Sequence, residues 1–227
     1  MTIETFSIMN HSIAEYFSRN GFVVFTDLIP LAAIHKVRSD FFESTETLIN
    51  KYSLKFDEVD REVRAYQLFT HHKLFRKNLY ALLQELCSIT CLSGSEGLTK
   101  VFKIQNLKVP VLRNQALRID FAQEPQFLQG IHQDVRGMRS SNCLNFWIPL
   151  QDVNESKGTL SVYPGSHNVG GIKPTSTNDS GYQIFTDEDV SKFQKIVLDI
   201  PQGSAVMFHP YLFHASIAAR TKALRLT

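Results

Sequence analysis

Apolar side chains in the first part of the chain recur mainly at helical spacing. They repeat every three or four positions over residues 12–20, and Gly21 follows where a helix C-cap is expected. Pro30 can begin a longer helix, because the same period continues from Leu31 to Leu48. A similar stripe returns between Leu74 and Cys91. This part of the chain is therefore predicted to be mostly helical.

Short apolar runs replace the helical pattern elsewhere. The run FVVF at residues 22–25 is rich in β-branched and aromatic residues, which indicates a buried strand. After Gly97 such runs follow one another, separated by Pro, Gly, Asn and Asp, as is typical of antiparallel strands. They read VFKI, QALRIDF, LNFWIPL, TLSVYP, FQKIVLDI and SAVMF.

The order of these elements predicts an α+β fold in a single domain, residues 1–227. A mostly helical part, residues 1–97, should cover one face of a β core, residues 98–227, built as a sandwich or jelly roll. The polar segment 168–192 is long for a loop in a compact domain. Its Gly, Ser, Thr and Asn content predicts mobility, and closure over the site as a lid is one hypothesis for it.

Composition and charge exclude several classes of protein. Lys and Arg number 24 against 22 Asp and Glu, so the net charge of +2 gives no basic surplus for nucleic acid. The longest charge-free apolar stretch is too short and too polar to span a membrane, and the N-terminus has no signal-peptide pattern. Three unevenly spaced cysteines indicate ordinary thiols. We expect a cytoplasmic protein with a small-molecule substrate, as a monomer or weak homodimer.

A metal-binding pattern occurs at His132 and Asp134. They flank Gln133, so in an extended strand their side chains emerge on the same face, where an imidazole and a carboxylate can share a cation. Alone this short motif is unspecific. Either His209 or His214 could complete a two-histidine, one-carboxylate face, and His214 is preferred because it follows a proline turn and precedes a serine on its strand face.

These segments, taken together, resemble the phytanoyl-CoA dioxygenase-like family of Fe(II)/2-oxoglutarate oxygenases, which includes ectoine hydroxylase. The matching pieces are GIHQD at 130–134, FWIPLQDVNESKGTLSVYPGSH at 146–167, QGSAVMFHPYLFHAS at 202–216, Arg225, and the opening NGFVVFTDLIP at 20–30. The resemblance implies a double-stranded β-helix (jelly-roll) core with the N-terminal helices packed on one sheet. The sequence departs from the family in ending two residues after Arg225, where family members continue.

The resemblance also implies the chemistry. His132, Asp134 and His214 would be the ligands of Fe(II), with 2-oxoglutarate and O₂ as cosubstrates and succinate and CO₂ as products. The substrate would be a small organic molecule that becomes hydroxylated. A related halogenase is less expected, because halogenases have a small residue in place of Asp134. The alternative from another class is a jelly roll that binds metal or ligand without turnover.

Further residues are implied for cosubstrate and substrate. Arg225 and Ser216 would bind the distal carboxylate of 2-oxoglutarate, for which a guanidinium fork is suited. Arg220 is a rival for this role, but Arg225 points away from the two leucines beside it. Gln115 and Trp147 would also contact the cosubstrate or wall its pocket.

Two arginines just beyond the metal motif, Arg136 and Arg139, are candidates for binding an anionic substrate group. Solvent-exposed loop arginines are the common alternative.

Overall fold

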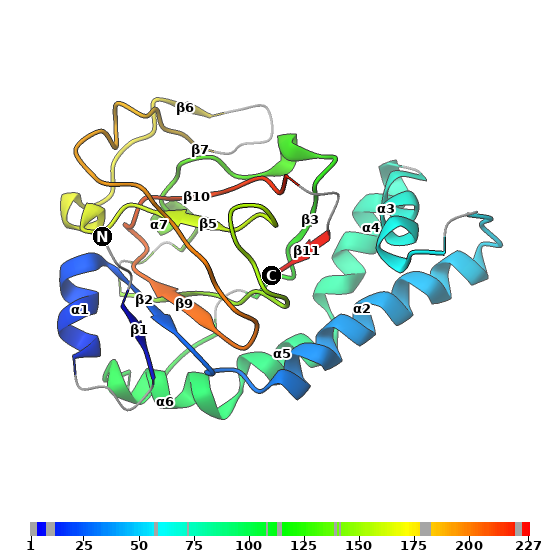
Figure 1. Cartoon of the computed structure of the whole chain (residues 1–227), viewed down its shortest axis with the longest axis horizontal. Helices are drawn as coiled ribbons and strands as arrows, with labels where there is room; N and C mark the ends of the chain where they lie inside the picture. The colour runs from blue at the N-terminus through cyan, green and yellow to red at the C-terminus, as the bar shows by residue number, and fades with distance from the viewer. Residues whose placement is uncertain are drawn as a thin grey trace.

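The computed structural model of the chain describes residues 4–7, 12–56, 59–71, 73–107, 109–112, 115–138, 140, 142–177, 183–220 and 224–227 (Figure 1). Its helices are α1 (Ile13–Asn20), α2 (Leu31–Lys51), α3 (Arg61–His71), α4 (Lys73–Gln84), α5 (Cys87–Ser93), α6 (Glu96–Ile104) and the single turn α7 (Val135–Met138). Short 3-10 turns lie at Pro125–Phe127 and Ser166–Val169.

The strands in the described residues form two main sheets and two strand pairs. They are β1 (Thr5–Phe6), β2 (Phe22–Phe25), β3 (Ile119–Phe121), β4 (Asn145–Trp147), β5 (Leu160–Val162), β6 (Ser176–Thr177), β7 (Gln183–Ile184), β8 (Ile196–Val197), β9 (Ala205–Phe208), β10 (His214–Ser216) and β11 (Leu224–Leu226). The sheet orders are β1-β2-β9-β4 and β10-β5-β8, and the pairs are β11-β3 and β6-β7. Apart from the parallel β1 and β2, all neighbouring strands are antiparallel.

Strand β2 is buried on both faces, which explains its continuous apolar run. Phe22 and Val24 point towards the second sheet and share a core with residues of β5 and β8. Val23 and Phe25 point the other way and pack among the helices. Because side chains alternate along a strand, one four-residue segment supplies both layers of the core. The fold is α+β, as predicted, with helices on one face of the central sheet.

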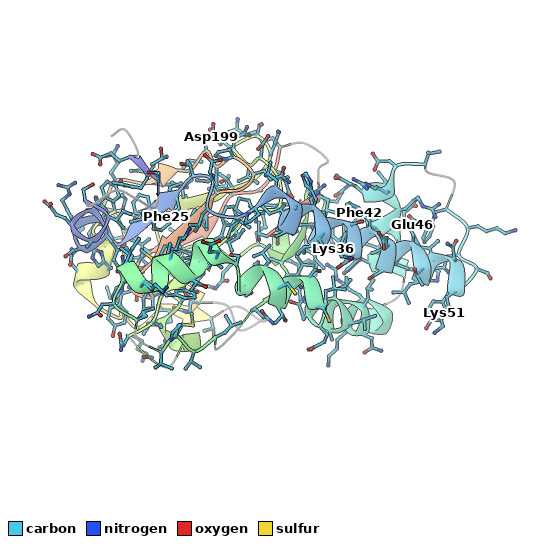
Figure 2. All side chains as sticks on the ribbon, turned by 90° about the horizontal axis from the view of Figure 1, so that it is seen from below. Phe25, Lys36, Phe42, Glu46, Lys51 and Asp199 are labelled. Atoms are coloured by element: carbon cyan, nitrogen blue, oxygen red, sulfur yellow. The ribbon has the colours of Figure 1, made fainter. Side chains whose placement is uncertain are left out.

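The helices build a layer beneath and beside the strands. In Figure 1, α6 lies below β2 and β9, α5 continues beside it to the right, and α2 extends away from the sheets to α3 and α4. Figure 2 shows α2 running from the region of Phe25 to Lys51 at the far end. Arg64 of α3 donates two hydrogen bonds, of 2.9 and 2.6 Å, to the carboxylate of Glu46 on α2. In the described part of the chain, no helix combines the length and apolar character needed to cross a bilayer.

The predicted helical starts and stops are mostly confirmed. Helix α1 ends at Gly21, whose φ of 77° lies in the left-handed region that favours glycine, and its N–H donates to the carbonyl of Phe17. Helix α2 begins directly after Pro30. The apolar stripe from Leu74 to Cys91 is divided between α4 and α5.

The interpretation of VFKI as a strand is wrong. Residues 101–104 are the last turn of α6. Ser95 has the extended backbone of an N-cap residue, and Leu98 and Val101 are three residues apart and both buried. The helical spacing of these two buried residues therefore outweighs the β-branched and aromatic composition of the run. The helical part of the chain consequently reaches Ile104 rather than ending at residue 97.

Candidate active site

Three side chains predicted to share a metal lie together in the structure. One ligand atom from each of His132, Asp134 and His214 can be chosen so that all three atoms lie within 4.8 Å of one another. His132 and His214 face each other across a bridge of two backbone hydrogen bonds, 3.0 and 3.2 Å long. Asp134 follows at the turn into α7. The motif therefore uses the end of an extended segment rather than a regular strand.

Both histidines are held in one orientation by backbone carbonyls. His132 Nδ1 lies 2.7 Å from the Gly130 oxygen, and His214 Nδ1 lies 3.0 Å from the Leu212 oxygen. A carbonyl can only accept, so Nδ1 carries the proton in each ring and Nε2 keeps its lone pair. These Nε2 atoms lie 3.4 and 3.6 Å from the two oxygens of Asp134. The three ligand atoms thus converge on one point.

The ionisation states suit metal binding. Burial, reinforced by the neighbouring His132, lowers the pKa of His214 to about 4. Burial alone would raise the pKa of Asp134, but His214, His132 and the more distant Arg118 lower it to about 2. At neutral pH the carboxylate is therefore ionised and His214 is neutral, which are the forms that coordinate a cation.

Asn145 on β4 supports the carboxylate. Its side-chain amide donates a 2.9 Å hydrogen bond to Asp134 Oδ2, and the residue is 7% exposed. A bond of this kind fixes which way the carboxylate faces and supplies the second shell that metal ligands usually have. The sequence interpretation did not single out Asn145.

A cavity of about 660 Å³ opens beside the cluster, and His132, Asp134, His214 and Asn145 line it. It reaches from the strands into the helical layer, so that most of its wall is apolar. The apolar lining includes Val37, Ile89, Leu92, Leu98, Phe102, Leu144, Phe146, Ile148 and Leu150. Concave, largely apolar cavities with a few polar groups are typical of small-molecule sites.

Three of the four residues predicted to contact a cosubstrate line this cavity. They are Ser216, Trp147 and Gln115. Gln115 does not lie in a strand; it precedes β3, and its amide bonds to Thr90 and Ser93 of α5 at 2.9 and 3.0 Å. Gln115 therefore connects the cavity wall to the helical layer.

The fourth residue, Arg225, is not among the described residues that line the cavity. It lies on β11 and is 3% exposed. Its Nη2 and Nε donate to Asp120 Oδ2 at 2.8 and 3.2 Å, and its Nη1 donates to the carbonyls of Thr159 and Ile217 at 3.0 and 3.2 Å. The rival Arg220 is exposed and pairs with Glu155.

Among the described residues that line the cavity, Arg118 is the one Lys or Arg. The sequence interpretation missed it. A usable signal was present, because Leu117, Ile119 and Phe121 alternate with Arg118 and Asp120. The apolar set packs in the core, and the two charges share the opposite face.

Arg136, a candidate for anion binding, is exposed on α7 and does not line the cavity, whereas its neighbours Gly137 and Met138 do. Arg139 lies outside the described residues. His209, the alternative third ligand, is half-buried against His167, with ring centroids 5.4 Å apart, and is not part of the metal cluster.

The segment predicted to be a lid is attached to the back of the metal motif. Gln133, fully buried, donates to the carbonyls of Gly170 and Tyr211 at 2.9 and 2.7 Å and accepts from Ile172 N–H at 2.8 Å. The Gln183 amide donates to the Gln133 carbonyl at 2.7 Å. None of the segment's described residues, 168–177 and 183–192, lines the cavity.

Comparison with known proteins gives a consistent family match. The family model "Phytanoyl-CoA dioxygenase (PhyH)" matches residues 17–227. The peroxisomal phytanoyl-CoA dioxygenases of Homo sapiens and Mus musculus are 23% and 25% identical over 93% of this chain. The chain spans 64% of the length of these two relatives.

Solved structures show the same fold at low sequence identity. AviO1 from Streptomyces viridochromogenes Tue57 superposes with a TM-score of 0.58 at 18% identity, covering 98% of this chain and 93% of that one. EvdO2 from Micromonospora carbonacea var. aurantiaca, complexed with 2-oxoglutarate, gives a TM-score of 0.53 at 13% identity and covers 99% and 89% of the two chains.

Proposed function

Because the chain belongs to the phytanoyl-CoA dioxygenase (PhyH) family, we propose that it is an Fe(II)- and 2-oxoglutarate-dependent oxygenase that hydroxylates a small organic substrate. In this proposal its two-sheet core is a double-stranded β-helix. The observation that carries the proposal is the His132, Asp134 and His214 cluster at the wall of a cavity of about 660 Å³.

The donor set fits Fe(II). Two imidazole nitrogens and one carboxylate form the facial set that leaves coordination positions open on non-haem iron. His132 and His214 offer Nε2 lone pairs because their Nδ1 protons are bound to backbone carbonyls. When bound, Fe(II) supplies the coupling of O₂ activation to oxidative decarboxylation of 2-oxoglutarate to succinate and CO₂.

The chain's own residues hold the reactants and exclude water. Asn145 keeps the Asp134 carboxylate turned towards the cluster. Ser216, Gln115 and Trp147 offer polar and aromatic contacts for 2-oxoglutarate within the same cavity. The apolar wall from the helical layer suits the body of an organic substrate and keeps the site dry.

Hydroxylation is proposed rather than halogenation because Asp134 supplies the third protein ligand. A halogenase needs a coordination position for chloride where this carboxylate stands. With chloride present, the unmodified protein should therefore release no chlorinated product, and detection of one by mass spectrometry would overturn this part of the proposal.

Succinate formation tests the proposal against a binding protein without turnover. Purified protein with Fe(II), ascorbate and 2-oxoglutarate should release succinate, and His132→Ala and His214→Ala should lower both iron binding and succinate to background. His209→Ala is the matched control, because this histidine lies outside the cluster and should retain both. Iron-loaded protein that forms no succinate with any of a panel of metabolites would favour the binding protein instead.

A further inference from the structure

The residues next to the metal ligands form the back of the metal cluster. His132 and Asp134 line the cavity, whereas Gln133 between them is fully buried and is not part of the lining. In the same way His214 lines the cavity, and the preceding Phe213 is fully buried outside it. Side chains of an extended segment alternate between two faces, so the neighbours of the ligands point away from the cavity.

The Gln133 side chain joins three separate parts of the chain. Its amide nitrogen donates to the carbonyls of Gly170, in segment 168–192, and of Tyr211, three residues before His214, at 2.9 and 2.7 Å. Both protons of the amide are thereby used. One buried side chain therefore connects the two ligand-bearing segments with each other and with segment 168–192.

The start of segment 168–192 also holds the backbone around Gln133. The Ile172 N–H donates to Gln133 Oε1 at 2.8 Å, and the Gln183 side chain donates to the Gln133 carbonyl at 2.7 Å. Gly171 lies so close that a Cβ added there would be 3.5 Å from Val135 Cγ1. Because Val135 directly follows a ligand, these contacts fix the backbone on both sides of that ligand.

The later part of the segment packs behind the two histidine ligands. Phe185 and Val190 share a small core cluster with Phe213 and the partly buried Ile131. The rings of Phe185 and Phe213 meet edge to face, with centroids 5.0 Å apart. Ile131 and Phe213 directly precede the two histidine ligands, so this cluster contacts the backbone that carries each of them.

We propose that segment 168–192 positions the metal ligands from behind and does not act as a lid, and that Gln133 is the positioning residue that connects the two. The inference rests on the proposed function for the identity of the metal. Its support is that the segment's contacts go to neighbours of the ligands, while none of its described residues lines the cavity. Loosening these contacts should therefore weaken metal binding.

Titration with Co(II) alone tests the inference without turnover, because the visible absorption of bound Co(II) depends on the geometry of its ligands. The variants are Gln133→Met, which keeps the length of the side chain without its hydrogen bonds, Gln183→Leu and Phe185→Ala. Ile184→Ala and Gln194→Leu are matched controls, since both side chains are exposed. Circular dichroism checks that each variant is folded.

Gln133→Met should bind Co(II) about 10- to 100-fold more weakly than the wild type. Its absorption spectrum at saturating Co(II) should also differ, because the ligands are no longer held in one arrangement. A protein that is only less stable would keep the wild-type spectrum once loaded. Gln183→Leu and Phe185→Ala should change affinity in the same direction by a smaller factor, and the two controls should match the wild type.

Wild-type Co(II) affinity and spectrum in all three variants would overturn the inference. If these variants also released succinate faster from Fe(II) and 2-oxoglutarate without substrate, the segment would act as a lid instead. A wild type that binds no Co(II) would overturn the inference too. If the wild type binds Co(II) but forms no succinate, the proposed function fails, whereas weaker Co(II) binding by Gln133→Met would still support the positioning role.

Discussion

Replacing Arg225 with methionine should destabilise the protein strongly, whatever its role towards a ligand. Methionine keeps an unbranched apolar side chain but removes every donor that Arg225 offers. Asp120 would lose its bonds of 2.8 and 3.2 Å, and the carbonyls of Thr159 and Ile217 would each lose the bond that Arg225 donates. Arg118, at 3.7 Å, is too distant to replace the hydrogen bonds.

Breaking a buried ion pair from one side costs about 3–5 kcal/mol. Since a domain of this kind is stable by about 5–15 kcal/mol, the change would remove at least about a fifth of the free energy of unfolding, and most of it in a marginally stable protein. For a chain of this length that corresponds to a fall of about 6–20 °C in Tm.

Denaturant unfolding, followed by circular dichroism, measures the effect through a double-mutant cycle. Arg225→Met and Asp120→Leu should each be destabilising, and the double variant should regain more than half of the summed loss, because neither charge is then buried without a partner. Simple additivity of the two losses, or an unchanged unfolding midpoint in Arg225→Met, would refute the view that this pair stabilises β3 and β11.

Three further predictions concern residues around the cluster and behind it. Asn145→Leu should weaken Fe(II) binding about 10- to 100-fold at constant fold, measured by competition with a chromogenic chelator, because Asp134 loses its orienting bond. Burial lowers the pKa of both His167 and His209, so the folded state binds fewer protons than the unfolded state. The free energy of unfolding should therefore fall as the pH drops below about 6.5. A Gln variant of either residue should flatten this pH dependence in denaturant titrations. Gln133→Ala removes the side-chain bonds to Gly170, Tyr211 and Ile172, so limited proteolysis should cut residues 170–184 faster. An unchanged cutting rate would contradict the anchoring role.

The sequence predicted the metal cluster better than its surroundings. His132, Asp134 and His214 could be found because their flanks match a family, although the short motif alone is unspecific. The roles of Asn145 and of the helical wall of the cavity depend on which elements become neighbours. That pairing is set by tertiary contacts, and no local pattern reports it.

The same distinction explains the errors in the fold. Gly21 and Pro30 act locally, so the boundaries of α1 and α2 were predictable. The helical state of VFKI was not predictable, because its composition favours a strand, while Val101 is buried at helical spacing from Leu98. The partner of Arg225 was equally hidden, since Asp120 lies more than a hundred positions earlier and is reached only through the β3-β11 register.

The pairing of β2 with β9 has a consequence for how the chain folds. Phe22 and Phe25 of β2 are paired with Phe208 and Ala205, so the central sheet joins nearly the two ends of the sequence. Contacts of such long separation form slowly, because a large loop must close before they stabilise anything. During synthesis the first half would emerge with the apolar strand β2 paired on one edge only, with the short strand β1. An N-terminal fragment ending at Ile104 should therefore aggregate rather than fold, and new chains should depend on chaperones until β9 has left the ribosome.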